Sequence, residues 1–388
     1  MVLRVKNTTM HTKKNILLII LLEFILKSCA AQDRFYVDSF GAKADGIFDN
    51  TEVINKCFMA ALQKSNSVVI FGKGKYRCQG RLNVEFMADN QITIKGESVA
   101  TSIEFDNLDI DRGFFITSKK KSFGKGKILL RGFKITGPGL GMGKKNEFYN
   151  SVRHLYGIGI SNIKSVEIDG IEVRGFYGNG IDISNKESRS INKVKFKKVE
   201  IKNCNIINVW GCSPSDSYGD GIYLSDSYNF VFLNNTISNG FKYTGSLGRG
   251  GIVIEDFTMN GVIYGNNISG YDRGIHIENS SGNITIKGNI LLDNRISFYL
   301  WSSGLNSNEQ PINIKFNIFR SNIISSYLDK IALRNKDRSY IAILREKPID
   351  KLDIIEKNKF FFDDSINTKS KAVKGNIRLS LFDNSFKN

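Results

Sequence analysis

The sequence predicts an all-β fold: a single-stranded right-handed parallel β-helix (a solenoid) with an N-terminal capping helix. Two observations carry this prediction. A Gly-Ile-x-Ile motif recurs along the middle of the chain, and a second series of short strands, apolar at every second residue and ended by Asn or Gly, runs between its copies. One such short unit cannot bury a hydrophobic face alone, so successive copies must stack as the rungs of a solenoid.

The first series sets the spacing of the rungs. Its members start at Gly157 ("GIGI"), Gly180 ("GIDI"), Gly221 ("GIYL"), Gly251 ("GIVI"), Gly274 ("GIHI") and Ser297 ("SFYL"), in steps of 23, 41, 30, 23 and 23 residues. In a parallel β-helix each strand pairs with its equivalent in the next rung, about 4.8 Å away. The two longer steps therefore indicate rungs with loops inserted at one turn.

The second series marks another side of each rung. Its members are "VEIDG" from Val166, "VEIKNC" from Val199, "VFLNN" from Val231, "VIYGN" from Val262 and "ITIKGN" from Ile284. Asn203, Asn235 and Asn266 each stand two residues after the last apolar residue of their strand. This spacing predicts an asparagine ladder at a turn of the solenoid.

An amphipathic helix is predicted near the start of the fold. Asp49 can cap it, with Glu52 three residues further on, and one apolar face is supplied by Val53, Ile54, Cys57, Ala60 and Ala61. Such a helix covers the first rung, which otherwise exposes its core and its unpaired edge. The repeat pattern fades near Ile331, so we expect the β-helix domain over residues 33–330 and a C-terminal cap and tail over 331–388.

Two stretches near the start carry a family resemblance. "VDSFGAKADGIFDNTEVINKCFMAAL", from Val37 to Leu62, and "VVIFGKGKY", from Val68 to Tyr76, resemble the opening of pectate-lyase-superfamily proteins, which are related to polygalacturonases and phage tailspike depolymerases. The resemblance extends over roughly residues 35–325 and implies the right-handed parallel β-helix fold. It is far less specific for chemistry, because one fold hosts many activities.

Residues 1–29 are predicted to be an export signal. Lys13 and Lys14 precede an apolar run over residues 16–26, which is too short to span a bilayer as a helix. The sequence "LKSC" that follows resembles a bacterial lipoprotein processing site and predicts lipid attachment at Cys29; ordinary signal-peptidase cleavage just after it is the alternative. We therefore expect an exported protein, either a surface or outer-membrane lipoprotein or a periplasmic or secreted protein.

The net charge of the chain indicates which kind of binding partner it attracts. The formal net charge of +17 favours attraction to polyanions, which for an exported protein means an acidic polysaccharide before nucleic acid. A lysine-rich composition without a selected partner accounts for the charge equally well.

Apart from Cys29, the cysteines (Cys57, Cys78, Cys204 and Cys212) are too few and too irregularly spaced for a disulfide scaffold or a metal site, so we expect buried free thiols.

The residues between the inward isoleucines point outward, so each rung presents two side chains on one outer face. From rung to rung these are Gly159 and Ser161, Asp182 and Ser184, Tyr223 and Ser225, Val253 and Glu255, His276 and Glu278, and Tyr299 and Trp301. Asp220 and Arg273 stand directly before the glycines of their rungs, and Arg249 stands two residues before its own. The functional site is expected where these titratable and aromatic residues gather.

A carboxylate pair is the predicted catalytic centre. Glu255 and Glu278 occupy one column on neighbouring rungs, with Cα atoms about 5 Å apart, and His276 lies about 6.8 Å along the strand from Glu278. Repulsion between carboxylates this close raises the pKa of one, which is what a glycosidase needs for its acid; narrow spacing of the pair favours retention and wider spacing inversion. His276 and Asp182 are predicted as auxiliary catalytic groups.

Further residues on this face are predicted to bind substrate. Arg249 and Arg273 can hold a uronate carboxylate or a sulfate in a bidentate manner, with Asp220 beside them. Aromatic side chains for stacking on sugar rings are supplied by Tyr223, Tyr299 and Trp301. The alternative for these residues is structural: a salt-bridged ladder of charges and an aromatic stack that only stabilises the solenoid.

The polygalacturonase pattern is met only in part. "GNGIDIS" is similar to that family's Asn-Thr-Asp-Gly strand and "GDGIYL" to its Gly-Asp-Asp strand, with Asp182 and Asp220 as the nearest matches. Gly221 stands in place of the second Asp, and Arg249 replaces the histidine of the Gly-His-Gly segment. Pectate-lyase chemistry would instead use an Arg or Lys base and often Ca²⁺. No run of ligands specific for calcium is found, so no cofactor is predicted, with Ca²⁺ admitted if the protein is a lyase.

The sequence thus predicts an exported β-helix enzyme that degrades a polysaccharide, expected to be acidic, by glycoside hydrolysis or β-elimination. The alternative is a non-catalytic glycan-binding or structural cell-surface β-helix that uses the same face for recognition. The segment "KKKSFGKGK", from Lys119, is basic enough to touch a polyanion but also fits a solvated hairpin.

Overall fold

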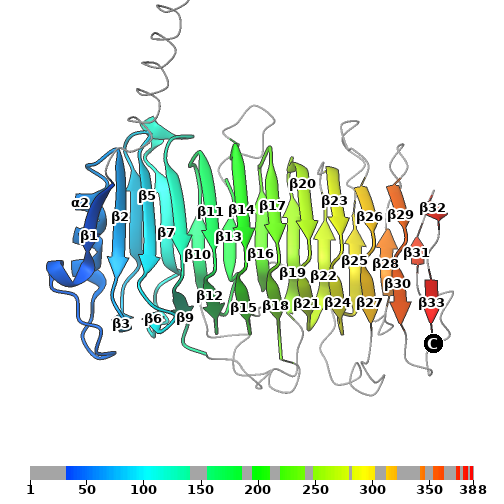
Figure 1. The fold of residues 1–388 in the computed structure, drawn as a ribbon, viewed down its shortest axis with the longest axis horizontal. Helices are drawn as coiled ribbons and strands as arrows, with labels where there is room; N and C mark the ends of the chain where they lie inside the picture. Colours follow the sequence, from blue (N-terminus) through cyan, green and yellow to red (C-terminus); the bar gives the residue numbers. More distant parts are fainter. Residues whose placement is uncertain are drawn as a thin grey trace, which may run out of the picture.

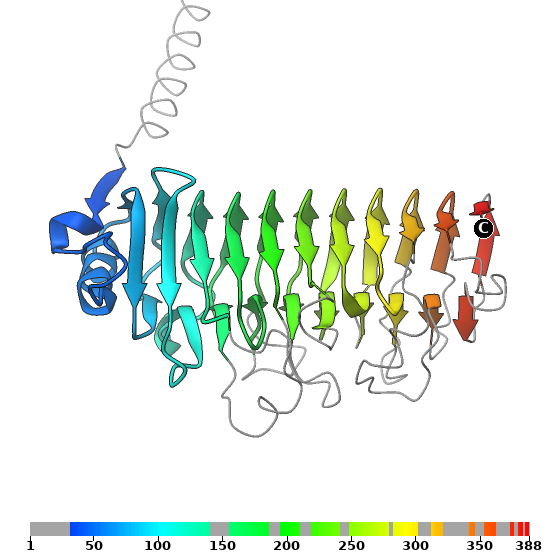
Figure 2. The ribbon, with the colours of Figure 1, turned by 90° about the horizontal axis from the view of Figure 1, so that it is seen from below.

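The computed structural model shows three parallel sheets that run side by side along one axis, with each turn of the chain adding a strand to each sheet (Figures 1 and 2). The structure describes residues 32–139, 155–185, 195–209, 219–240, 248–278, 282–301, 312–320, 341–345, 353–361, 373–375, 379–382 and 385–387. The predicted export signal with Cys29, and also Cys212, lie outside these ranges. Within them, no helix has both the length and the hydropathy needed to cross a membrane.

The strands fall into sheets of 12, 10 and 11 members. The 12-stranded sheet contains, in spatial order, β1 (Asp33–Tyr36), β2 (Asn66–Phe71), β5 (Gln91–Gly96), β8 (Lys127–Arg131), β11 (Ser165–Asp169), β14 (Lys198–Lys202), β17 (Phe230–Leu233), β20 (Met259–Tyr264), β23 (Gly282–Lys287), β26 (Ile312–Lys315), β29 (Asp353–Glu356) and β32 (Leu379–Phe382). The 10-stranded sheet contains β4 (Leu82–Phe86), β7 (Arg112–Ser118), β10 (Tyr156–Ile160), β13 (Ile181–Ile183), β16 (Asp220–Ser225), β19 (Gly248–Glu255), β22 (Tyr271–Ile277), β25 (Ile296–Leu300), β28 (Ile341–Arg345) and β31 (Val373–Gly375). The 11-stranded sheet contains β3 (Gly74–Cys78), β6 (Thr101–Phe105), β9 (Lys134–Thr136), β12 (Glu172–Arg174), β15 (Asn205–Ile207), β18 (Thr236–Ser238), β21 (Asn267–Ser269), β24 (Ile290–Leu292), β27 (Ile318–Arg320), β30 (Lys359–Phe361) and β33 (Ser385–Lys387).

The inward isoleucines form the core and confirm the parallel β-helix. Strand-to-strand register aligns one buried column of the 10-stranded sheet, made of Ile158, Ile181, Ile222, Ile252, Ile275 and Phe298. The glycine that opens each motif is needed for close approach: a Cβ on Gly251 would lie 2.4 Å from Ile268 Cγ2 and 2.6 Å from the carbonyl oxygen of Gly274. A side chain there would therefore push neighbouring rungs apart.

An asparagine ladder is present. In its first rung, the ladder position is one residue later in the chain than the sequence predicted. Its members are Asn235, Asn266, Asn289, Asn317 and Asn358, each accepting hydrogen bonds at Oδ1 from the preceding rung. Cys204, not Asn203, occupies the first position, and its backbone N–H donates to Asn235 Oδ1. Asn203 instead has a left-handed φ of 55° and bonds Asp169. Counting two residues from the last apolar residue of each strand gave the wrong position here. The last apolar residue of the next strand, Leu233, pairs with the charged Lys202 and not with Ile201.

Helix α2 (Thr51–Ala61) covers the first rung, as predicted, and follows the 3₁₀ turn η1 (Val37–Phe40). Its buried face consists of Ile54, Cys57, Phe58 and Ala61, so Phe58 joins the predicted set while Val53 and Ala60 are only partly buried. The capping box is not formed. Asn50 holds the N-cap position, Asp49 accepts hydrogen bonds from the Thr51 N–H and hydroxyl, and Glu52 pairs with Lys56 at 2.6 Å.

The strand ladder continues beyond residue 330, where the sequence analysis ended the β-helix domain. Strands β28 and β31 extend the 10-stranded sheet, β29 and β32 the 12-stranded sheet, and β30 and β33 the 11-stranded sheet, all in parallel register. These strands are short and irregularly spaced along the chain. The sequence therefore shows no fixed period in this part of the chain. The predicted end of the strand ladder at residue 330 is corrected, because the strands continue beyond it.

The cysteines within the described ranges match the prediction. Cys57, Cys78 and Cys204 are free and buried. Burial raises the pKa of the Cys57 and Cys204 thiols to about 12, so these groups stay protonated and unreactive near neutral pH.

Candidate functional site

The outward positions of the 10-stranded sheet align as predicted. Strand pairing places Gly159, Asp182, Tyr223, Val253, His276 and Tyr299 in one column. In the adjacent column Ser225 pairs with Glu255, and the backbone N–H groups of Glu278 and Trp301 each donate to the rung before them. These side chains point away from the isoleucine core, yet Glu255 and His276 are only 9% and 1% exposed. The charged groups therefore lie where solvent screens them little.

Glu255 and Glu278 meet directly. The side-chain ligand atoms of Glu255, His276 and Glu278 all lie within 4.8 Å of one another. Glu255 Oε2 accepts a 2.8 Å hydrogen bond from the Tyr223 hydroxyl, and Glu255 Oε1 lies 3.5 Å from Arg249 NH2. Two buried carboxyl groups this close repel each other when both are ionised, which favours a proton on one of them.

Burial explains why that proton is retained. Desolvation raises the pKa of Glu255 to about 8; the Arg249 guanidinium opposes this shift, and the negative charge of Glu278 adds to it. Desolvation also raises the pKa of Glu278, against the positive charges of Arg249 and Arg273. Near neutral pH the pair therefore offers a protonated carboxyl group, which is the state that a general acid requires.

His276 is a neutral ring in this cluster. Burial, and then the guanidiniums of Arg273 and Arg249, hold its pKa well below the usual range. Its Nδ1 lies 3.2 Å from Arg273 NH1, and since a guanidinium can only donate, Nδ1 accepts and Nε2 carries the proton. Nε2 lies 2.8 Å from Glu278 Oε2 but lacks the alignment of a hydrogen bond. The ring also meets Tyr299 edge-on, with centroids 4.7 Å apart.

The three clustered residues do not fit a metal ion in this arrangement, although their ligand atoms are close enough to hold one. A protonated Nε2 has no lone pair to give a cation. The nearby guanidiniums of Arg249 and Arg273 add positive charge, which repels one further. We therefore derive no step through a metal at this site.

The arginines predicted to bind substrate are paired within the protein. Arg249 holds Asp220 through two hydrogen bonds, of 2.8 and 2.5 Å, and both side chains are buried. Arg273 Nε lies 3.8 Å from Asp272 Oδ2, and Arg295 forms a bidentate pair with Asp272. A buried ladder of alternating charge thus runs across successive strands and reaches Glu255 through Arg249.

Sequence reasoning missed two members of this ladder, Asp272 and Arg295. Each stands two residues before the first residue of its rung motif, as Arg249 does. The register puts Arg249, Asp272 and Arg295 on equivalent positions of successive strands, directly before the aligned Gly250, Arg273 and Ile296. Comparing the rungs also at the position two residues before each Gly-Ile-x-Ile motif would have revealed this column of charged residues.

The other predicted residues divide between the acid pair and the neighbouring rungs. Asp182 accepts hydrogen bonds from Asn179 Nδ2 at 2.9 Å and from the Ser184 hydroxyl at 2.6 Å. The Arg273 guanidinium lies 4.3 Å from the centroid of the Tyr299 ring, and Trp301 packs partly buried against the same ring. Tyr299 is therefore committed to internal contacts, whereas Tyr223, Glu278 and Trp301 keep partly exposed surfaces.

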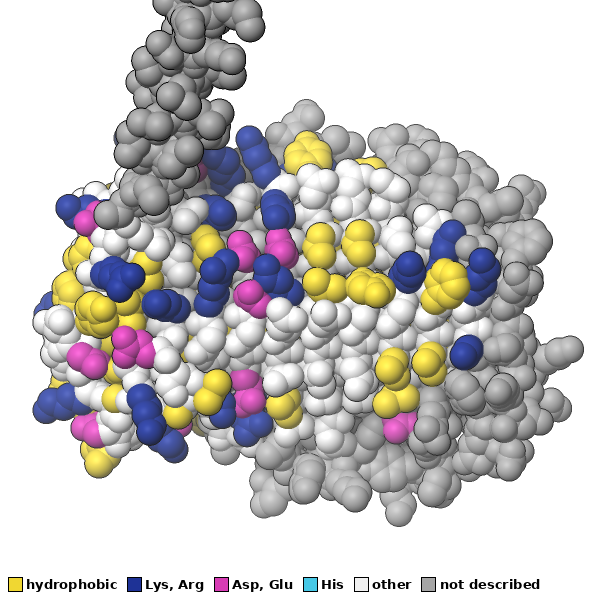
Figure 3. Space-filling view, viewed as in Figure 1, with side chains coloured by type: hydrophobic (Ala, Val, Ile, Leu, Met, Phe, Trp, Pro, Cys, Tyr) yellow, Lys and Arg dark blue, Asp and Glu magenta, His cyan; other side chains and the backbone are white. Residues whose placement is uncertain are grey.

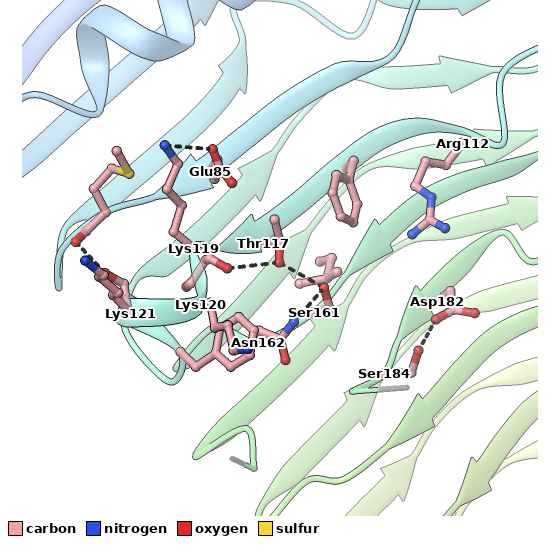
Figure 4. A pocket seen from close by; sticks show the side chains of 16 residues that line it. Glu85, Arg112, Thr117, Lys119, Lys120, Lys121, Ser161, Asn162, Asp182 and Ser184 are labelled. Carbon is pink, nitrogen blue, oxygen red and sulfur yellow. Dashed lines mark hydrogen bonds and ion pairs between the residues drawn. The ribbon is translucent and has the colours of Figure 1, made fainter. Parts of the chain in front are cut away.

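A pocket of about 880 Å³ lies on the same sheet, over β4, β7, β10 and β13 (Figure 4). Among the residues predicted for the site, Asp182 lines it and the Glu255–Glu278 pair does not. The lining consists of Glu85, Met87, Arg112, Phe115, Thr117, Ser118, Lys119, Lys120, Lys121, Ser122, Phe123, Ile160, Ser161, Asn162, Asp182 and Ser184. Asp182 thus links an open pocket to the column that leads to the acid pair.

Comparison with known proteins agrees with the fold. Residues 132–309 match a protein-family model described as a right handed beta helix region. The uncharacterized protein YclG of Bacillus subtilis strain 168 is 24% identical over an alignment that covers 45% of this chain and 32% of that protein, so the chain spans about a third of that relative's length. The family model and the arrangement of the strands together show a right-handed parallel β-helix, the fold that the resemblance implied.

Solved structures give the same result. ORF18 of Geobacillus virus E2 superposes with a TM-score of 0.55 at 11% identity, over 99% of this chain and 66% of that one. The N-terminal fragment of bacteriophage phi29 gene product 12 superposes with a TM-score of 0.52 at 14% identity, over 95% of this chain and 73% of the fragment. At these identities the likeness concerns the fold alone.

Proposed function

We propose that this protein is an exported enzyme that cleaves an acidic polysaccharide by glycoside hydrolysis, with its acid–base groups on the outer face of the 10-stranded sheet. The observation that carries the proposal is the buried carboxyl pair. Burial raises the pKa of Glu255 to about 8, and its Oε2 accepts a hydrogen bond from the Tyr223 hydroxyl, so Glu255 holds a proton at neutral pH beside the partly exposed Glu278. Such a group can protonate the leaving oxygen of a glycosidic bond.

The two glutamates act as one acid and not as acid and nucleophile. One oxygen of each lies within 4.8 Å of the other, closer than the glycosidase carboxyl groups that flank a sugar, which are about 5–5.5 Å apart for retention and about 6.5–9.5 Å apart for inversion. The second carboxylate is Asp182, which lies two rungs from Val253 and so on the order of 10 Å across the strands. We assign Asp182 to the activation of water, an arrangement of the inverting type.

Export is supported by the sequence that precedes the fold. Lys13, Lys14 and the apolar run over residues 16–26 have the order of a secretory signal, and Cys29 is the proposed lipid-bearing residue. Residues 1–28 carry five basic residues and one acidic residue, so the chain without them has a net charge of 17 − 4 = +13, which supports an anionic substrate.

A second candidate function is a glycan-binding surface protein without turnover. It is favoured by the internal pairing of the charges: Arg249 is bound by Asp220, and Asp272 by Arg295. These groups stabilise the sheet whether or not a reaction takes place.

The test is to incubate the purified protein with polygalacturonate, alginate and neutral dextran, following reducing ends and the absorbance of unsaturated uronates together. Hydrolysis predicts new reducing ends without new absorbance. Glu255→Gln and Asp182→Asn should each lower kcat by about 10²–10⁴-fold, because each removes a proton-transfer group. Glu200→Gln, on β14 of the 12-stranded sheet, is the matched control and should leave kcat unchanged.

Each other outcome decides against the proposal. If absorbance rises with the reducing ends, the reaction is an elimination. If neither signal appears on any glycan while one of them retains the protein, the binding function replaces the enzyme. Full activity of Glu255→Gln would remove the acid pair from the mechanism.

A further inference from the structure

The basic segment Lys119–Lys121 lines the 880 Å³ pocket at the end of β7 (Figure 4). Arg112 joins it from the start of the same strand, where its Nε lies 2.8 Å from Asp111 Oδ2, and the carboxylates in the lining are those of Glu85 and Asp182. Glu85 lies 3.7 Å from the Lys119 ammonium. No ion pair of Lys120 or Lys121 occurs within the ranges that the structure describes, and both side chains are exposed. The pocket therefore has an excess of positive charge.

The lysines project from a backbone that is held in place. Ser118 Oγ donates to the Lys125 carbonyl at 2.8 Å, which closes the loop that contains the 3₁₀ turn η2 (Lys120–Ser122). Ser122 Oγ donates to the Met87 carbonyl at 2.5 Å, which ties the turn to the preceding rung. A site that is already ordered loses less conformational entropy when a ligand binds.

The floor of the pocket suits a sugar. The hydroxyls of Thr117 and Ser161 lie 3.0 Å apart on neighbouring rungs, and Ser184 continues the row, so hydroxyl groups line one side. The ring of Phe115 lies against the guanidiniums of Arg81 and Arg112, which are 4.7 and 4.9 Å from its centroid and so hold fixed positive charge at this side of the pocket. Hydroxyls and fixed cations are the groups that recognise a sugar bearing an acidic substituent.

The pocket also lies in line with the acid pair. From Ser161 to Glu255 the outer face crosses β13 and β16, which is three rung steps or about 14 Å. Asp182 and Ser184 lie on this path and line the pocket. An extended chain bound in the pocket can therefore reach Glu255 along the same sheet.

The 12-stranded sheet shows the contrast. On its outer face basic and acidic side chains are interspersed (Figure 3), with Arg131 2.6 Å from Glu167 and Lys198 2.7 Å from Glu200. Charges neutralised in this way attract a polyanion weakly.

We propose that the pocket over β4, β7, β10 and β13 is a binding subsite for a carboxylated or sulfated sugar unit of an anionic glycan, with Lys120 and Lys121 facing the anionic group and the hydroxyls of Thr117 and Ser161 beside the sugar. The inference rests on the proposed function for the reaction that follows. The binding step itself does not depend on turnover.

Binding of the full chain is measured by affinity electrophoresis through gels that contain polygalacturonate, dextran sulfate or neutral dextran, at low and at physiological ionic strength. Lys120→Ala/Lys121→Ala should bind the anionic polymer about tenfold or more weakly, because two charge-assisted contacts are lost. The matched control is Lys64→Ala/Lys73→Ala, which removes two exposed lysines from the N-terminal end and should bind as the unaltered protein does. Thermal unfolding midpoints show whether each variant is folded.

The polymer arms identify the ligand: preference for polygalacturonate assigns a carboxylate, and preference for dextran sulfate a sulfate. Equal losses in both double variants would reduce the effect to net charge and overturn the subsite, as would unchanged binding by Lys120→Ala/Lys121→Ala. Equally tight retention by single-stranded DNA would show a nonspecific polyanion surface. If the pocket binds glycan and no glycan is cleaved, the subsite is supported and the proposed hydrolysis is refuted. If glycan is cleaved and Lys120→Ala/Lys121→Ala has an unchanged KM, the hydrolysis is supported and the subsite is refuted.

Discussion

Replacing Glu255 with Gln should change how stability depends on pH. The carboxyl of Glu255 has its ordinary pKa of 4.5 in the unfolded chain and a pKa of about 8 in the folded protein, where burial disfavours its charge. Between these values the folded protein binds more protons than the unfolded chain, so the free energy of unfolding falls as pH rises. The contribution is complete below about pH 4.5 and is lost by about pH 8.

The structure sets the size of the effect. A pKa difference of about 3.5 corresponds to about 5 kcal/mol as an upper value. A chain of 388 residues has an unfolding entropy of roughly 0.8 kcal/mol per kelvin, so the expected change in Tm is about 6 °C. Gln imitates the protonated carboxyl and cannot ionise. Glu255→Gln and the unaltered protein should therefore match near pH 5, and the variant should be the more stable by several degrees near pH 9.

The assay is thermal unfolding followed by circular dichroism from pH 5 to pH 9 for both proteins. Glu52→Gln is the control, since Glu52 is exposed on α2 and pairs only with Lys56 among its described contacts. Its difference from the unaltered protein should not grow at high pH. Parallel profiles for Glu255→Gln and the unaltered protein, or a variant that is less stable at pH 9, would show that Glu255 is ionised at neutral pH and refute the reasoning.

Two further predictions concern the buried polar groups. Asp220→Asn leaves the buried Arg249 guanidinium without its counter-charge and should cost about 3–5 kcal/mol, whereas Asp106→Asn, in an exposed ion pair, should cost no more than about 1 kcal/mol; equal losses in Tm would contradict this. Asn266→Ala removes a ladder member that bonds both neighbouring rungs and should cost about 2–5 kcal/mol in denaturant unfolding. Asn229→Ala, at an exposed turn position, should have little effect, and a similar cost for both would deny the ladder a special role.

The sequence was sufficient for the rungs but not for the end of the solenoid. Apolar residues alternate strictly with other residues around Ile252 and Ile275, and this pattern allows a single register between stacked strands. A shift by one residue would turn all the apolar side chains outward. Beyond residue 330 the strands are short and unevenly spaced, so no period announced that β28 to β33 continue the sheets. The spacing of strands, not their composition, limited the prediction there.

For the candidate site, register was predictable and protonation was not. The columns that contain Asp182, His276 and Glu255 follow from the repeat alone. The sequence could not show that Arg249 and Arg273 lie buried and paired, since exposure depends on how side chains from several rungs pack together. That packing also decided that Nε2 of His276 carries the proton, because Arg273 occupies the other ring nitrogen.

The sequence by itself determined the parallel β-helix, its capping helix and the face on which polar groups gather, because alternation and repeat length are local properties that a stack of strands must obey. The tertiary structure alone decided that Glu255 and Glu278 lie close together in a buried cluster, where burial raises the pKa of both, and that Lys120 and Lys121 line a pocket at the end of β7. Both depend on burial and on distances between side chains from different rungs, and these are set only when the rungs are packed against one another.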